Sequence, residues 1–134
     1  MEYIVYLLKY SGSADKKYTV VIFLNDKKIK TIHFGQNGAS DYTLHKDSLR
    51  MREYVRRHGG VISKTLMSED NETKVHTKMN SVIKSTKEKW TITGITTAGF
   101  WSRWLLWSEP SLKGAINLIE NKFDISIKRG SPPS

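Results

Sequence analysis

The sequence of 134 residues contains no cysteine, only three prolines, and no hydrophobic run close to the roughly 20 residues that a bilayer-spanning helix needs. Without cysteine there can be no disulfide bond, no thiolate metal ligand and no thiol nucleophile. The first residues also carry an acid, Glu2, where a secretory signal peptide would carry basic residues. We therefore expect one domain with no membrane span and no classical export signal. The lack of cysteine is compatible with a reducing compartment and equally with no redox constraint.

The familiar catalytic and nucleotide-binding motifs are absent as well. The sequence has no Walker loop, no Gly-x-Gly-x-x-Gly, no Gly-x-Ser-x-Gly and no His-Glu-x-x-His. Gly35 and Gly38 follow a predicted strand and precede a predicted helix, where a loop could hold an anion, but two glycines alone are a weak signal. We therefore predict that the protein is not an enzyme and that it has no cofactor and no metal ion.

One minor alternative is a metal-dependent nuclease, because His33, Asp41, His45, Asp47 and His58 lie near a single loop-to-helix junction. His45 and Asp47 do not share a helical face, and His58 follows His45 by about three and a half turns. A common ligand set built from His33, His45 or Asp47 would therefore need the loop to fold back over the start of the helix. Histidines in such positions are more often surface or capping residues.

The charge balance favours an acidic partner. There are 22 Lys and Arg residues against 13 Asp and Glu, which gives a net charge of +9. The excess of base is +3 over residues 1–40, +4 over residues 41–90 and +2 over residues 91–134. Because no arm or tail concentrates the charge, it indicates a general attraction to acidic surfaces rather than a dedicated reading head for nucleic acid.

The hydrophobic pattern predicts an α+β fold with a small N-terminal antiparallel β-meander, two or three helices and a short C-terminal strand. A helix is expected from Ser111, whose following apolar residues form one stripe. A polar Pro- and Gly-containing tail fills residues 129–134. We expect strands in five stretches rich in β-branched, aromatic or alternating residues: residues 2–10, 18–24, 29–34, 91–97 and 124–128. The block at residues 100–107 is either a strand or a helix.

A loop over residues 35–43 leads into a predicted helix at residues 44–58, capped by Asp41 or Thr43 and ended by two glycines. Leu44, Met51 and Val55 share its apolar face. Four arginines lie on this helix: Arg50 and Arg57 project in one direction, while Arg52 and Arg56 lie well away from them. They lie on both sides of the apolar face instead of forming one positive stripe. Arginines in this arrangement are more often solvated side chains at the edge of the core than a phosphate-binding surface.

The block at residues 100–107 contains three of the four tryptophans. As a helix or as a strand it is apolar on more than one face, so one small core can hardly cover it. Either it is the central core element, or one side is core and the other docks a partner, because Trp and Arg are enriched at interface hot spots. We predict an interface that includes Phe100, Trp101, Arg103, Trp104 and Trp107. At least one tryptophan should then be exposed in the monomer, with Trp101 the first candidate.

Several motifs resemble a family of small uncharacterised proteins encoded by large double-stranded DNA viruses of protists and algae. The resemblance covers residues 9–58 and 87–128 and is carried by His33-Phe34-Gly35, Ser40-Asp41-Tyr42-Thr43, His45-Lys46-Asp47, Arg57-His58 and Thr97-Ala98-Gly99-Phe100-Trp101-Ser102-Arg103-Trp104-Leu105-Leu106-Trp107. In that family the Arg-His pair is followed closely by a basic stretch and a Trp, similar to residues 87–90. Residues 59–86 are therefore expected to be a family-atypical insertion, with a weak helix around Val75, Met79 and Val82.

The resemblance implies a virus-encoded protein but brings no activity with it. The preferred hypothesis is a virion structural protein: a minor capsid or cement subunit in a hetero-oligomeric assembly with other viral capsid proteins, located in the virion and, during infection, in the host cytoplasm. The alternative is a sequence-nonspecific nucleic-acid-binding protein that associates with viral DNA. Its contacts would come from Lys27, Lys28, Lys30, Arg50, Arg52, Arg56 and Arg57. Tyr3, Tyr18 and Phe23 could stack on bases if they were exposed, although core burial is the more common role.

Overall fold

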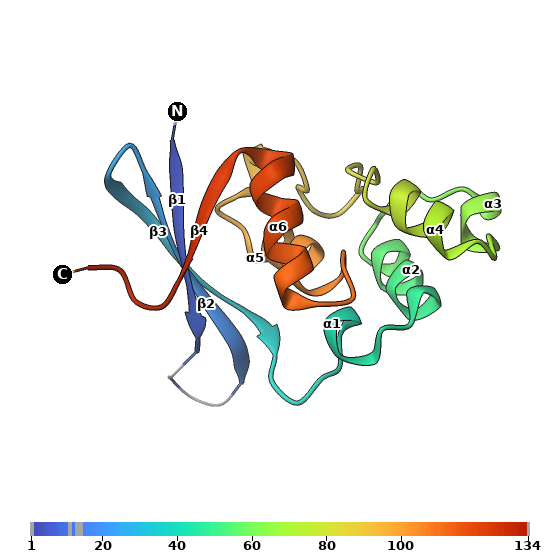
Figure 1. The fold of residues 1–134 in the computed structure, drawn as a ribbon, viewed down its shortest axis with the longest axis horizontal. Coiled ribbons are helices and arrows are strands. Elements are labelled where there is room, and N and C mark those ends of the chain that lie inside the picture. The colour runs from blue at the N-terminus through green and yellow to red at the C-terminus, as the bar shows by residue number, and fades with distance from the viewer. Residues whose placement is uncertain (1, 11, 13–14, 134) are drawn as a thin grey trace.

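The computed structural model describes residues 2–10, 12 and 15–133 and has an α+β fold (Figure 1). The described strands and helices, in chain order, are β1 (Tyr3–Lys9), β2 (Lys16–Leu24), β3 (Lys27–Gln36), α1 (Tyr42–His45), α2 (Ser48–Arg57), α3 (Lys64–Met67), α4 (Glu72–Met79), the 3₁₀ turn η1 (Ile92–Gly94), α5 (Ala98–Trp101), the π-helical η2 (Ser102–Leu106), α6 (Leu112–Phe123) and β4 (Ile125–Arg129). The sheet lies at one end of the molecule and α3 and α4 lie at the other.

The four strands form one sheet in the order β3-β2-β1-β4. The first three are an antiparallel meander, and β4 returns at the edge parallel to β1. The turn between β2 and β3 consists of Asn25 and Asp26, both with positive φ (50° and 69°), which is the backbone that a tight two-residue hairpin requires. The predicted meander and C-terminal strand are thus confirmed.

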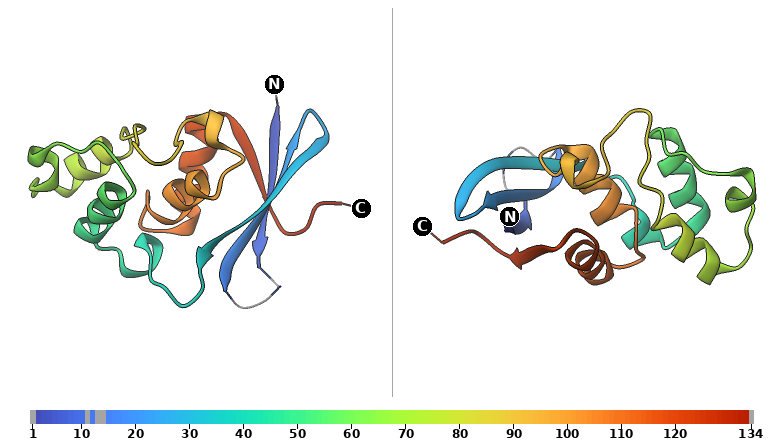
Figure 2. Two further views of the ribbon diagram at one scale, coloured as in Figure 1. Left: turned by 180° about the vertical axis from the view of Figure 1, so that it is seen from behind. Right: turned by 90° about the horizontal axis from the view of Figure 1, so that it is seen from above.

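The helices cover only one face of the sheet, as both views of Figure 2 show. Alternate residues of the strands, such as Val5, Leu7, Val20 and Ile22, are no more than 2% exposed and form the floor of the core. The tyrosines proposed to stack on bases, Tyr3 and Tyr18, pack against the same core. Phe23 lies instead on the open face beside Tyr6, with 5.7 Å between ring centroids.

The single helix expected over residues 44–58 is divided into α1 and α2. Asp41 caps α1 by accepting from the Thr43 N–H (2.9 Å), and Asp47 caps α2 by accepting from the Leu49 N–H (2.9 Å). Lys46, between them, has a left-handed backbone with φ 58°. Because two capping aspartates lie six residues apart, a second helix start outcompetes continuation of the first. Leu44 is consequently 63% exposed rather than part of the core.

Residues 59–86 begin and end at the same place. Gly60 and Ser85 form an isolated antiparallel bridge, and the Thr86 N–H donates to the Gly59 carbonyl at 2.9 Å. Adjacent ends are the geometry that an insertion requires, because the flanking chain can join directly across them. The segment is nevertheless packed rather than extended into solvent, since four of its side chains are buried: Leu66, Val75, Met79 and Val82.

The strand expected at residues 91–97 is wrong, because this stretch folds into η1 and further turns. Its backbone bonds are local: the Gly94 N–H donates to the Thr91 carbonyl (2.8 Å) and the Thr97 N–H to the Gly94 carbonyl (2.9 Å). β-branched residues favour a strand only where another strand is available for pairing, and none lies beside this segment among the described residues. The tryptophan block that follows is helical, as α5 and η2.

Candidate functional site: a basic cleft beside the tryptophan block

The tryptophan block is mostly core. Phe100, Trp101 and Trp104 are each 0% exposed. The indole N–H groups are also used internally, because Trp101 Nε1 donates to the Ile95 carbonyl and Trp104 Nε1 donates to the Trp90 carbonyl, both at 2.8 Å. A side chain without accessible surface cannot contact a partner, so the predicted interface role of these three residues, and the predicted exposure of Trp101, are wrong for the folded chain.

Arg103 is also 0% exposed and is wrong as an interface residue. Its Nη2 donates to the Met79 carbonyl at 2.6 Å and its Nη1 to the Trp107 carbonyl at 2.9 Å, so it holds the end of α4 against the core. The guanidinium lies between two indoles, 4.3 Å from the Trp104 ring centroid and 5.4 Å from that of Trp90. Burial lowers the pKa of Arg103 to about 9, which leaves it charged at neutral pH.

Arg52, like Arg103, donates to backbone carbonyls at the end of a helix. It is 5% exposed, and its Nη1 donates to the carbonyls of Leu66, Met67 and Glu69 at 2.9–3.1 Å. A guanidinium with several donors is well suited to the unpaired carbonyls at a helix end, here that of α3. Arg52 therefore cannot reach a phosphate, and its place in the predicted nucleic-acid surface is wrong.

Some of the remaining polar residues of the motifs meet at an open cleft of about 470 Å³ between the sheet and α2. We call this the basic cleft. One wall is a single side of α2 and its end, with Arg50, Tyr54, Arg57 and His58. The opposite wall follows the end of β3 and the loop after it, with Lys17 from β2: Lys17, Gly35, Gln36, Ala39, Ser40 and Asp41. The floor is the side of the tryptophan block that faces the cleft, where Ser102 and Trp107 are partly exposed and Leu106 is buried.

Four aromatic rings stack along the floor and the α2 wall. His58 stacks on Tyr54 (4.0 Å between centroids), Tyr54 on Trp107 (4.2 Å, 4° between planes), and Trp107 contacts His45 (5.4 Å). Burial raises the pKa of Tyr54 to about 12, so its hydroxyl stays neutral. Tyr54 has a stacked ring on each side, so it presents its edge rather than a face to a ligand, whereas the contact between Trp107 and His45 is tilted by 51°.

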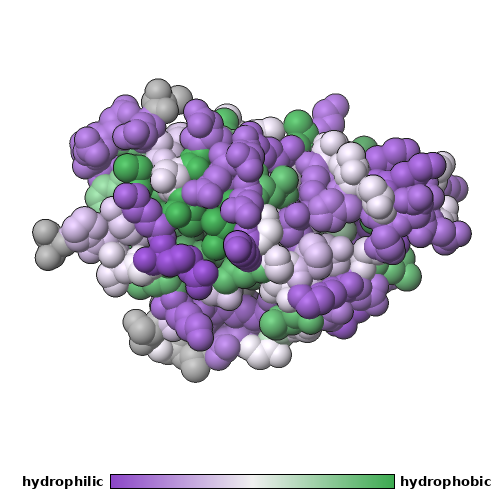
Figure 3. Space-filling model, viewed as in Figure 1, coloured by the Kyte–Doolittle hydropathy of each residue, from purple (hydrophilic) through white to green (hydrophobic). Residues whose placement is uncertain are grey.

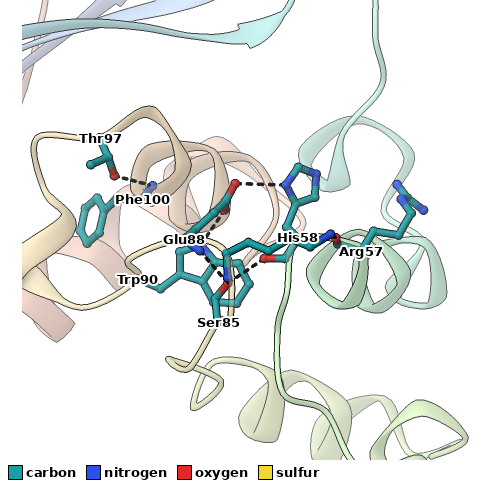
Figure 4. Close-up of polar contacts among 8 residues, drawn as sticks. Arg57, His58, Ser85, Glu88, Trp90, Thr97 and Phe100 are labelled. Atoms are coloured by element: carbon teal, nitrogen blue, oxygen red, sulfur yellow. Dashed lines mark hydrogen bonds and ion pairs between the residues drawn. The ribbon is translucent and has the colours of Figure 1, made fainter.

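His58 is held in place by a chain of hydrogen bonds (Figure 4). Its Nδ1 lies 3.1 Å from Glu88 Oε2, and Glu88 Oε1 accepts from Trp90 Nε1 at 2.9 Å. The Ser85 hydroxyl donates to the His58 carbonyl at 2.7 Å and accepts from the Glu88 N–H at 2.9 Å. Because a carboxylate only accepts, Nδ1 carries the proton, and Nε2 has no hydrogen-bond partner among the described residues.

The cleft carries uncompensated positive charge. The Lys17 ammonium is neutralised by Asp41, 2.5 Å away. Arg50 and Arg57 are exposed, and among the described residues no carboxylate lies within ion-pair distance of either. In Figure 4 the Arg57 guanidinium and the His58 ring extend toward the same side of the chain. The predicted common direction of Arg50 and Arg57 is thus confirmed, since both line the cleft.

The other predicted cations do not line this cleft. Lys27, Lys28 and Lys30 are exposed along β3, and Arg56 is exposed elsewhere on α2. Tyr54, Glu88 and Ser102 were not predicted as site residues. The sequence holds a signal for Tyr54, because it falls four residues after Arg50 and three before Arg57 on one helical side. No sequence pattern links Glu88 to His58, which is 30 residues away.

The histidines and carboxylates of the alternative nuclease site are not brought together. His33 Nδ1 lies 2.8 Å from the Thr19 hydroxyl on β2, His45 Nδ1 accepts from the Asp47 N–H at 2.9 Å, and Asp47 caps α2. Across residues 2–10, 12 and 15–133, no group of three or more His, Asp or Glu side chains is placed to hold a metal ion. In the same part of the chain, no helix combines the length and hydrophobicity needed to cross a bilayer.

Comparisons with known proteins find one family. Residues 6–58 match the model of a family of unknown function, DUF5754. No curated protein matches the chain, and no solved structure matches it. The matched stretch contains the whole α2 wall of the basic cleft and the opposite wall from Lys17 to Asp41, while the floor comes from the tryptophan block outside it.

Proposed function

We propose that this protein is a structural component of a virus particle, a minor capsid subunit that attaches to an acidic surface of a larger shell protein. The observation that carries the proposal is that parts of the motifs that resemble the viral family line one open, basic cleft. Arg57 and His58 lie on the α2 wall, Gly35, Ser40 and Asp41 on the opposite wall, and the end of the tryptophan block forms the floor.

The chemical character of the cleft suits attachment. Guanidinium groups give charge-assisted, paired hydrogen bonds to carboxylates, and a partly buried tryptophan supplies apolar contact area beside them. Trp107 is the member of the predicted interface that keeps exposed surface and lines the cleft. The attachment surface is therefore Arg50, Arg57 and Trp107, and the buried tryptophans hold this surface in position.

Purified particles of the encoding virus provide the test. The protein should be present at a fixed copy number below that of the major shell protein. Chains with Arg50→Glu and Arg57→Glu should fold but fail to be incorporated, because both substitutions place like charges against the acidic partner. Arg56→Glu, on the same helix but outside the cleft, is the matched control and should be incorporated normally. Absence of the wild-type protein from particles, with expression confined to early infection, would refute the proposal.

A second function, sequence-nonspecific binding of viral DNA, is favoured by a separate observation. Lys27, Lys28 and Lys30 are exposed on β3, and no carboxylate among the described residues lies within ion-pair distance of them. If this strand contacts phosphates, the logarithm of the duplex affinity should fall with that of salt with a slope near −0.9 per contact. Replacing the three lysines with Gln should reduce that slope. Binding that disappears by about 150 mM salt would leave only a general charge attraction.

A further inference from the structure

We propose that the group held in the basic cleft is a phosphoryl group with more than one negative charge, a phosphomonoester, bound by Arg50, Arg57 and His58. The proposal deepens the function given above by naming the chemical group that the partner presents, and it rests on that function for the choice of the cleft as the contact site.

The charge of the cleft exceeds what one carboxylate can balance. Arg50 and Arg57 both lack an anionic partner among the described residues. Two further charges act on Tyr54 in opposite directions, the carboxylate of Glu88 and the buried guanidinium of Arg103. Arg50 and Arg57 therefore remain as the unpaired charges of the cleft. A single carboxylate carries one charge and two oxygens, which one guanidinium satisfies. A phosphomonoester carries a charge of about −1.5 to −2 and three terminal oxygens, which matches two guanidinium groups better.

The polar groups proposed to bind the ligand lie on one side of α2 and at its end. Arg50 and Arg57 are seven residues apart on the same side of α2, about 10.5 Å along the axis, and their long side chains can converge on a group lying between them. Tyr54 lies between the two positions and closes the wall with its ring. His58 continues this side beyond the helix end. Because Glu88 holds Nδ1–H, Nε2 donates to a phosphoryl oxygen only in the doubly protonated imidazolium form, which a bound anion favours.

His58 is organised before any ligand arrives. Glu88 fixes the ring through Nδ1, and Glu88 is fixed in turn by Trp90 Nε1 and by the Ser85 hydroxyl. Stacking on Tyr54 restrains rotation of the imidazole. Less conformational entropy is then lost on binding, which raises the affinity for a small group. Glu88 is accordingly a positioning residue, since it acts on the ligand through His58.

The aromatic stack limits what the cleft can recognise besides the phosphoryl group. Tyr54 is stacked between the rings of His58 and Trp107. Base recognition by stacking requires a free ring face, and Tyr54 has none. Tyr54 should therefore contribute nothing to recognition of a base attached to the phosphoryl group.

The test uses the complete chain and two-dimensional amide NMR with inorganic phosphate as the first probe. Addition of phosphate should shift the amides of the cleft walls, residues 35–40 and 57–58, ahead of those on the open sheet face. A short phosphoserine peptide should bind about tenfold or more tightly than the same peptide with Glu in place of phosphoserine. Equal affinity for the two peptides would overturn the proposal, and so would amide chemical-shift changes spread evenly over all exposed lysines.

Matched variants locate the binding. Arg57→Gln and Arg50→Gln should each weaken phosphate binding about tenfold or more, whereas Arg56→Gln should leave it unchanged. Glu88→Gln should weaken binding less and should broaden or shift the His58 ring resonances, which a role remote from His58 would not do. Equal losses for Arg56→Gln and Arg57→Gln would show a diffuse charge effect and refute the site.

Two further arms identify the source of the group. An oligonucleotide with a 5′-phosphate that binds more tightly than its unphosphorylated form, whatever its base, would indicate a nucleic-acid end. Tighter binding of the phosphoserine peptide than of the 5′-phosphorylated oligonucleotide would indicate a phosphorylated protein. Both arms use isolated protein, so their failure leaves the incorporation of wild-type chain into particles unaffected. Conversely, a chain that binds phosphate but is not incorporated into particles would refute the structural role and support the phosphoryl site.

Discussion

Replacing Trp101 with Ala separates a core role for the tryptophan block from an interface role. The side chain is 0% exposed and its ring packs against Phe100 (5.2 Å between centroids) and Phe34 (6.4 Å). Removing a fully buried Trp side chain costs about 3–5 kcal/mol, and leaving the Ile95 carbonyl without its indole donor adds about 1 kcal/mol. The expected loss of about 4–6 kcal/mol is close to the entire stability of many domains of this size.

Urea unfolding followed by circular dichroism and tryptophan fluorescence measures this loss. Trp101→Ala should be largely unfolded without denaturant, and Trp101→Phe, which keeps most of the ring volume, should unfold cooperatively at lower urea than the wild type. Trp107→Ala is the matched comparison, because Trp107 is partly exposed and stacked on Tyr54. It should cost about 1–2 kcal/mol and remain folded. A Trp101→Ala protein within about 1 kcal/mol of wild type would refute the assignment of this residue to the core.

Three other outcomes are expected. Arg52→Met should lower the free energy of unfolding by about 2–4 kcal/mol because the carbonyls at the end of α3 lose their donor, whereas Arg56→Met should change it by less than about 0.5 kcal/mol, both by urea titration. Burial, and then the positive charge of Arg50, lowers the pKa of His45, so the unfolded chain binds more protons and stability should fall as pH drops through the ordinary value of 6.5. His45→Gln should flatten that pH dependence, and an unchanged slope would contradict the assignment. A variant in which a short Gly linker joins Gly60 to Ser85 should be less stable but should keep the sheet and α6 folded, as amide NMR would show. Complete unfolding of this variant would show that residues 61–84 are part of the core rather than an insertion.

Whole elements could be predicted from the sequence, while their tertiary partners could not. Hydrophobic residues gather in the part of Figure 3 that β1, β4 and α6 occupy in Figure 1, and the α3–α4 end is largely hydrophilic. Strand alternation, turn residues and one apolar helical stripe are properties of short stretches of sequence, so they predicted the meander, α6 and β4. The capping aspartates are equally local signals, of which Asp41 was predicted and Asp47 was not.

Partnerships between distant segments lay beyond the pattern. Arg50 and Arg57 share a direction because of helical geometry alone, so the sequence placed them together correctly. Arg52, on the same helix, is buried only because the end of α3 packs over it, and Arg103 only because α4 and two indoles surround it. The chemistry of an arginine is the same in both settings, and its accessibility depends on what covers it.

Local spacing thus determined the fold class, the strands of the meander, the last helix and one wall of the cleft, because backbone geometry repeats every few residues. The tertiary structure decided which tryptophans are core, since burial is a property of the whole packed chain. It also decided that His58 meets Glu88 across 30 residues and that the block ending in Trp107 forms the floor of the cleft. These contacts join segments that carry no shared period, so only the folded chain brings them together.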